Sequence, residues 1–217
     1  MTHLEAFGYK TAWLAVLDRS QADVAEALGL TGGRNVPGYE AAGAFSQTGM
    51  LPPVPGVGGR WTLAVSFDLA EISPTRLVTL SALLGTRVQA FASHRVVEAH
   101  RWLEADSGTL RRHLEVVGES GELKAWTGTP TAVEVDLGLP AVEQIAGDDA
   151  RFDVVLGVNE GTVMAVAAAW SVDPTTLSGE VPGHALLFDD VDEGPPAGHP
   201  VESPSRTPWL WSKLFRR

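Results

Sequence analysis

Two histidines and two glutamates in the middle of the chain have the residue types that chemistry needs. The histidines are His100 and His113, and Glu98 and Glu115 lie close to them in the sequence. Imidazoles and carboxylates are common ligands of divalent metal ions. A carboxylate beside an imidazole also tunes its pKa for general acid–base catalysis. The four residues are therefore candidate metal ligands or catalytic groups if the fold brings them together, and a divalent metal is the one cofactor that they suggest.

The segment that must position these residues alternates between apolar and polar side chains through residues 94–128. Turn-forming residues interrupt the alternation at 105–108 and at 118–121. A period of two predicts half-buried strands, whereas the many good helix formers in the segment make helices the rival interpretation. Because both turns contain glycine and bracket short segments, we expect a three-stranded antiparallel meander.

The predicted turns also set the register of this meander. With a four-residue turn at 105–108, His100 faces His113 and Glu98 faces Glu115, with paired Cβ atoms ~5 Å apart. Trp102 then faces Arg111 as a cation–π pair, and Trp126 lies beside His113, where it can stack on a flat ligand. One face is expected to carry all the candidate binding residues, which are Glu98, His100, Trp102, Arg111, His113, Glu115 and Trp126. The alternative is that this is merely the solvated face of a half-buried sheet.

Two strand–helix–strand units precede the meander. The similar apolar runs WLAVLD and TLAVSFD each predict a buried strand. Ser20 and Gly29 are expected to bound the first following helix, and Ser73 and Gly85 the second. The order β-α-β-β-α-β predicts a ferredoxin-like split βαβ arrangement. The expected fold is therefore α+β, with an antiparallel sheet that begins as this arrangement, is extended by the β-meander, and has helices mainly on one face.

Composition divides the chain into two parts. Residues 1–177 are expected to form a single α+β domain. Prolines, glycines and acids dominate from Ser178 onward, and such a composition cannot bury enough apolar surface to fold. Residues 178–217 are therefore expected to be a Pro/Gly/acid-rich tail, which ends in an aromatic and basic segment, Trp209–Arg217, called here the C-terminal stub.

Charge and cysteine content restrict the partners and the location. The 217 residues include 27 acidic and 16 basic ones, which gives a formal net charge of −11. Nucleic-acid phosphates and acidic membranes repel such a chain, so we expect no nucleic-acid partner. No run approaches the ~18 apolar residues that predict a membrane span, and the first residues lack the pattern of a secretory signal. The absence of cysteine is compatible with a reducing cytoplasm, which is the expected location.

Several short motifs resemble a family of uncharacterised bacterial proteins. They are His94-Arg95-Val96-Val97-Glu98-x-His100-x-Trp102, Gly108-x-Leu110-x-Arg112, Gly118-Glu119-x-Gly121-Glu122 and Trp170-Ser171-Val172-Asp173-Pro174-Thr175. The resemblance covers roughly residues 10–177. Because that family is one of hypothetical proteins with no known activity, the resemblance implies no catalytic residue and supports only the interpretation of the middle segment as one unit.

The catalytic and nucleotide-binding motifs that the sequence lacks bear on its function. It has no H-E-x-x-H, P-loop or G-x-S-x-G motif. We therefore expect a non-catalytic cytoplasmic binding or regulatory protein, such as an immunity protein or similar antagonist, with a protein or a small ligand as its partner. The alternative is a metal-dependent or acid–base enzyme that uses the His/Glu cluster of the meander.

Overall fold

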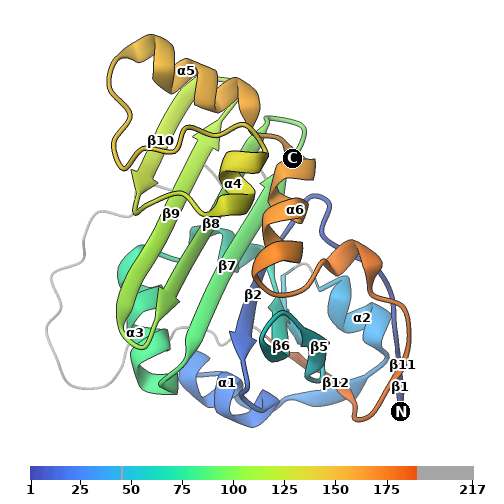
Figure 1. Cartoon of the computed structure of the whole chain (residues 1–217). Coiled ribbons are helices and arrows are strands. Elements are labelled where there is room, and N and C mark those ends of the chain that lie inside the picture. The colour runs from blue at the N-terminus through green and yellow to red at the C-terminus, as the bar shows by residue number, and fades with distance from the viewer. Residues whose placement is uncertain (45, 190–217) are drawn as a thin grey trace, which may run out of the picture.

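The computed structural model describes residues 1–44 and 46–189. It is an α+β protein in which ten strands form one large antiparallel sheet and six α-helices lie in the described chain (Figure 1). The helices are α1 (Gln21–Leu28), α2 (Gly38–Ala42), α3 (Pro74–Leu84), α4 (Ala132–Asp136), α5 (Asp148–Gly157) and α6 (Glu160–Trp170), with two 3-10 helices, η1 (Phe67–Glu71) and η2 (Pro174–Thr176).

The large sheet follows the order β10-β9-β8-β7-β2-β6-β4-β12-β3, and β5 also pairs with β6. Its strands are β2 (Thr11–Leu17), β3 (Arg34–Val36), β4 (Thr48–Met50), β5 (Val54–Gly56), β6 (Gly59–Val65), β7 (Arg87–His94), β8 (Ala99–Asp106), β9 (Thr109–Val117), β10 (Glu122–Thr127) and β12 (Ala185–Phe188). A second sheet pairs β1 (Thr2–Leu4) with β11 (Gly179–Val181). The strands β8, β9 and β10 confirm the predicted meander.

Local signals place both of the predicted helices correctly. Ser20 caps α1 through a capping box with Asp23, and Ser73 caps α3 by accepting a hydrogen bond from the backbone of Arg76. Gly29 and Gly85 follow these helices in the left-handed region, with φ values of 79° and 59°. Because that region is unfavourable for side chains with a Cβ, glycine is the residue expected at such an end.

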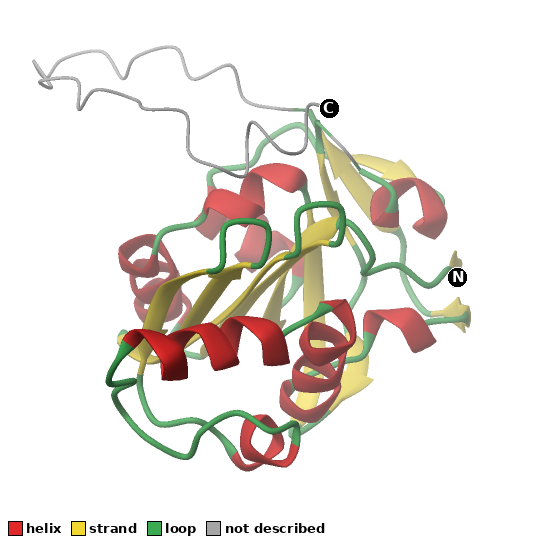
Figure 2. Ribbon diagram, turned by 90° about the horizontal axis from the view of Figure 1, so that it is seen from above, coloured by secondary structure: helices red, strands yellow, loops and turns green. Residues whose placement is uncertain are grey.

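Helices cover both faces of the sheet, so the expectation of helices mainly on one face is wrong (Figure 2). The α3 face, covered by α1 and α3, buries Leu14 and Val88. The α6 face, covered by α4, α5 and α6, buries Trp13 and Phe91, whose rings stack with centroids 5.1 Å apart. The run TAWLAVL of β2 explains this arrangement, since a continuous apolar strand must be buried on both sides.

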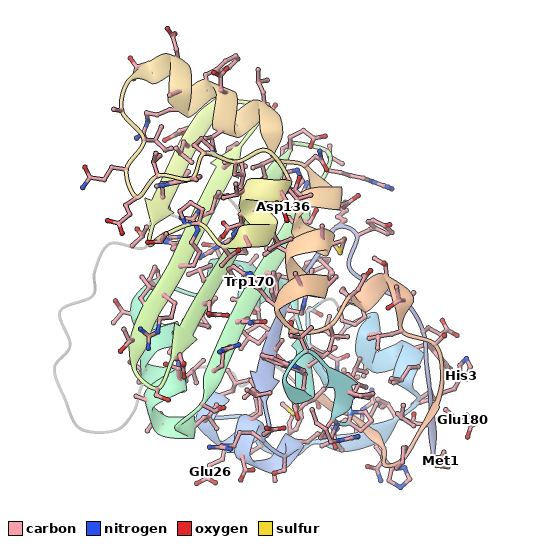
Figure 3. The ribbon with its side chains drawn as sticks, in the orientation of Figure 1. Met1, His3, Glu26, Asp136, Trp170 and Glu180 are labelled. Atoms are coloured by element: carbon pink, nitrogen blue, oxygen red, sulfur yellow. The ribbon has the colours of Figure 1, made fainter. Side chains whose placement is uncertain are left out.

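The end of the described chain returns to both sheets. Strand β12 lies between β3 and β4, and β11 pairs with β1, so that His3 is opposite Glu180 (Figure 3). Residues 179–188 therefore belong to the folded sheets rather than to a tail. The remainder of the predicted tail, with its C-terminal stub, lies outside the described residues. Among those described, no single helix has the length and apolar character of a membrane span, although α5 and α6 pass that test as a pair bent by 78°.

Candidate functional site

The predicted His/Glu cluster is divided between the two faces of the sheet. The β8–β9 hairpin has a two-residue turn, Ser107-Gly108, in which both residues have positive φ. Asp106 therefore pairs with Thr109, where a four-residue turn had been expected. Two-residue turns of this kind match the right-handed twist of hairpin strands. The register predicted from a wider turn is wrong.

A β-bulge then completes the separation. Ala105 pairs with Leu110 and Glu104 with Arg112, which leaves Arg111 as the extra residue of β9. As a result His100 lies opposite Val116 instead of His113, a displacement of three residues. Because side chains alternate between faces, an odd displacement moves one partner to the opposite side of the sheet. His100 therefore lies on the α6 face and His113 on the α3 face.

On the α6 face, His100 is part of a chain of hydrogen-bonded groups. Its Nε2 lies 2.9 Å from Oε2 of Glu98, and its Nδ1 lies 3.2 Å from Oγ of Ser93. The Ser93 hydroxyl donates to Oε1 of Glu160, 3.0 Å away, which also accepts the backbone N–H of Lys10. Ser93 and His100 are fully buried, whereas the side chain of Glu98 is 53% exposed. Burial lowers the pKa of His100, although its bond to Glu98 acts in the opposite direction.

On the α3 face, His113 and Glu115 join an arginine that holds the η1 segment against the sheet. Oε2 of Glu115 lies 3.5 Å from both Nε2 of His113 and Nε of Arg101. The Arg101 guanidinium donates to the backbone carbonyls of Ala70 and Ile72. Burial is the main cause that lowers the pKa of His113, and the positive charge of Arg101 adds to it. These groups stabilise the packing of a loop on the sheet.

The predicted aromatic residues belong to a third network, which is centred on a glutamate buried on the α6 face. Oε1 of Glu134 accepts from Nε1 of Trp102 at 2.9 Å and from Nε of Arg112 at 2.8 Å. Oε2 of Glu134 accepts both the backbone N–H and the hydroxyl of Thr131. The cation–π pair joins Arg112 to Trp126, with 4.2 Å from the guanidinium carbon to the ring centroid.

The expected pair of Trp102 with Arg111 is not formed, because Trp102 lies opposite Leu114 and the bulge leaves Arg111 exposed. Glu134 was foreseeable as the third residue of a Thr131 capping box. Its partners were not, since they come from strands more than 20 residues away in the sequence. Nothing in the sequence marks Ser93 or Glu160 as neighbours of His100.

The four predicted metal ligands are thus not assembled into one site. Glu98 and His100 form one pair and His113 and Glu115 another, on opposite faces of the sheet. Across residues 1–44 and 46–189, no group of three or more His, Cys, Asp or Glu side chains is arranged to hold a metal ion.

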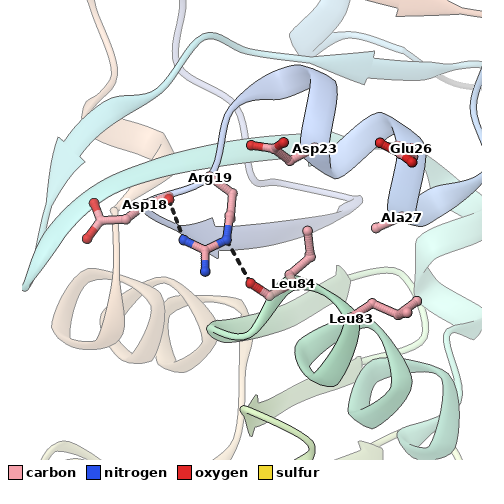
Figure 4. A pocket seen from close by; sticks show the side chains of 7 residues that line it. All are labelled: Asp18, Arg19, Asp23, Glu26, Ala27, Leu83 and Leu84. Carbon is pink, nitrogen blue, oxygen red and sulfur yellow. Dashed lines mark hydrogen bonds between the residues drawn. The ribbon is translucent and has the colours of Figure 1, made fainter.

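A surface depression with a volume of about 640 Å³ lies between α1 and α3 (Figure 4). Three of its charged groups, Asp18, Arg19 and Asp23, have partners within the fold. Nε of Arg19 donates to the carbonyl of Leu84 at 2.7 Å, and Asp23 caps α1. Oδ1 of Asp18 accepts the backbone N–H of Arg60 at 2.9 Å. The depression is therefore a polar surface in which these three side chains are engaged by the fold.

A second depression, of about 390 Å³, lies between β10 and α5. The β10 strand is one edge of the large sheet, and Arg151 joins it to α5 by donating to the carbonyl of Leu123 at 2.8 Å. Phe152 of α5 lies against the β9–β10 turn, where a Cβ on Gly121 would come within 3.2 Å of its ring. This depression therefore continues onto the outer side of α5.

The outer side of α5 combines carboxylates with exposed apolar side chains. Val154 and Val155 are buried against the sheet. The α5 face, defined as the exposed side chains of this helix on the opposite side, consists of Asp149, Phe152, Asp153 and Leu156. These positions share one side because 3.6 residues complete a helical turn. This helix was not predicted from the sequence, although the acidic residues of its first turn are a signal for a helix N-terminus.

Comparisons were made with protein-family models, with curated proteins and with solved structures. None of them matches this chain. The resemblance noted from the sequence motifs therefore stays a prediction, and the function must be argued from the residues themselves.

Proposed function

We propose that this is a non-catalytic binding protein and that the α5 face is its contact surface. The observation that carries the proposal is the exposure of Phe152 and Leu156, which are 49% and 67% exposed on a helix whose other side buries Val154 and Val155. Large apolar side chains that share one side of a helix in water are typical of contact surfaces. Lone exposed apolar residues are ordinary, but these two are one helical turn apart.

The chain that precedes α5 also carries exposed apolar residues. Five of the 11 exposed large apolar residues in the described chain lie between positions 135 and 156, and they are Val135, Leu137, Val142, Phe152 and Leu156. The backbone carbonyl of Val142 accepts from Nε1 of Trp126 at 3.0 Å, which holds this part of the chain against β10. Exposed apolar groups are therefore frequent in this stretch of the chain, which Val142 connects to β10.

Charge defines the chemistry of the partner. Asp149 and Asp153 flank Phe152 on the α5 face, and Asp148 begins the same helix. Arg151, the one basic residue of α5, is engaged with the carbonyl of Leu123. A surface that alternates carboxylates and apolar groups complements a segment that alternates basic and apolar groups. The proposed partner is therefore a basic, amphipathic protein segment, which is compatible with an antagonist role in the cytoplasm.

The alternative of an acid–base enzyme has one specific observation in its favour. Glu98, His100 and Ser93 form a continuous hydrogen-bonded chain that begins at a half-exposed carboxylate. A nucleophile must meet its substrate, whereas Ser93 and His100 have no exposed surface. The binding proposal has the stronger support, because its groups are accessible as they stand.

We also infer that the centre of the sheet is the split βαβ arrangement expected from the sequence. The order β7-β2-β6-β4 has antiparallel neighbours throughout, and α1 and α3 follow β2 and β6 on one face. On this interpretation the meander β8–β10 and the strands β3, β5 and β12 are additions to a ferredoxin-like centre.

The experiment titrates the ¹⁵N-labelled protein with a synthetic peptide that alternates lysine and leucine and records amide shifts. We expect the largest shifts in α5 and β10, and their loss in a Phe152→Ser, Leu156→Ser variant. Leu83→Ser on α3 is a matched control, because Leu83 is also 67% exposed. Shifts that are absent from α5, or that are equally weakened by the control, would show that the α5 face is not the contact surface.

A further inference from the structure

The charge of the chain is unevenly distributed, and its C-terminal stub has the composition that the α5 face complements. Residues 209–217 read WLWSKLFRR, with three basic residues and no acidic one. The net charge of −11 is therefore made of −14 in residues 1–208 and +3 in the stub. Apolar residues stand at 209, 210, 211, 214 and 215, interleaved with the basic ones. The stub is thus a basic, amphipathic segment carried by the protein itself.

We propose that the C-terminal stub of the same chain occupies the α5 face and competes there with external partners. This rests on the proposed function, since it takes the α5 face as a contact surface. The apolar ring of Phe152 and the side chain of Leu156 would receive the stub's aromatic residues, and Asp149 and Asp153 its cations. Such a contact buries apolar groups that are now exposed and pairs charges of opposite sign.

The length of the connecting chain permits this contact. Nineteen residues, 190–208, separate the last described residue from the stub. An extended chain spans up to ~3.3–3.6 Å per residue, so this connection reaches roughly 60 Å. A domain of this size has a radius of gyration near ~17 Å and is thus only ~45 Å across. The stub can therefore reach α5 from the end of β12.

Attachment to the same chain strengthens a weak contact. Tethering through a connection that can span the distance gives a segment an effective concentration near ~1 mM. A contact with a dissociation constant of ~0.1 mM would then be formed in about nine of ten molecules. An external basic segment would bind with about tenfold weaker apparent affinity, because only the uncovered fraction accepts it. Only partners that bind the α5 face tightly enough to displace the stub would therefore occupy it.

Because the 217 residues include no cysteine, a single introduced cysteine allows a direct test in the whole chain. A nitroxide spin label attached to a Ser212→Cys variant should broaden the amide signals of α5 and β10. Phe152→Ser with Leu156→Ser should abolish this broadening, whereas Leu83→Ser should not. The effect should weaken at high salt, because the screening length falls from ~10 Å at 0.1 M to ~3 Å at 1 M.

A second arm measures competition. The triple variant Lys213→Glu, Arg216→Glu, Arg217→Glu should bind the lysine–leucine peptide about tenfold more tightly than the original chain. Broadening centred on another surface, or no broadening anywhere, would overturn the proposed occupant. If the peptide still shifts α5 in that case, the contact surface stands and only the competition fails; if it does not, both proposals fail.

Discussion

Removing Glu134 tests whether the buried network of the α6 face stabilises the fold. The side chain of Glu134 has no exposed surface and accepts hydrogen bonds from Trp102, Arg112 and Thr131. In a Glu134→Ala variant the guanidinium of Arg112, which is also buried, loses its counter-charge. Breaking one half of a buried ion pair costs about 3–5 kcal/mol. For a chain of this length that loss lowers Tm by roughly 6–20 °C.

The assay is urea unfolding followed by far-UV circular dichroism, with thermal unfolding as a second readout. Glu143→Ala is the control, because Glu143 is exposed and accepts one bond, from Thr129 at 2.9 Å. That variant should change the free energy of unfolding by less than about 0.5 kcal/mol. Replacing both partners, Arg112→Met with Glu134→Leu, should cost less than Glu134→Ala alone, since no unpaired charge remains.

Equal stability of Glu134→Ala and Glu143→Ala would refute this reasoning. It would mean that water reaches Arg112 or that the surrounding chain rearranges without cost. If Arg112→Met with Glu134→Leu is as unstable as Glu134→Ala, the network stabilises the fold through the packing of its side chains and not through their charges.

Three further predictions concern the pH response, the bulge and the last described strand. Burial depresses the pKa of His100 in the folded protein, so the unfolded chain binds a proton there at a higher pH than the folded protein does. The contribution of neutral His100 to the free energy of unfolding is therefore present above about pH 6.5 and is lost as pH falls through the folded pKa. NMR titration of His100 checks this, and a His100 pKa above the ordinary imidazole value of about 6.5 contradicts it. Deleting Arg111, the extra residue of the bulge, should cost less than about 1 kcal/mol, because every paired residue of β9 keeps its partner and its face. Deleting the paired Glu115 should cost more than about 4 kcal/mol, because a one-residue slip reverses the faces of the neighbouring residues; similar urea midpoints for the two deletions would exclude the bulge. Leu187 of β12 is 2% exposed, so Leu187→Ala should lower the free energy of unfolding by about 2–5 kcal/mol in the same urea assay. An unchanged free energy of unfolding would place β12 outside the core.

Local features of the fold were predictable from the sequence, and long-range ones were not. The caps at Ser20 and Ser73 depend on residues three positions away, so the sequence contains the whole signal. The register of β8 and β9 depends on one extra residue, Arg111, and no alternation pattern shows which position bulges. Since that single residue decides which face His113 occupies, the predicted cluster failed although all three strands were correctly placed.

The prediction that a tail begins at Ser178 was wrong for a different reason, which is that it depended on average composition. The segment Ala185–Phe188 is a short apolar run among prolines, glycines and acids, and the average composition conceals it. Its burial comes from β3 and β4, which are far away in the sequence. The exposed face of α5 was equally hidden, because exposure of Phe152 and Leu156 is known only when the sheet beneath the helix is known.

The position of β12 between β3 and β4 has a consequence for synthesis on the ribosome. Arg34 of β3 pairs with Leu187, and about 150 residues separate them in the chain. At roughly 5–20 residues per second, translation of that interval takes about 8–30 s. Throughout this time β3 has no partner strand in the large sheet. The edge of β4 that β12 later covers has unpaired backbone groups, to which other strands can bind. The nascent chain is therefore most vulnerable to misassociation just before its last described strand emerges.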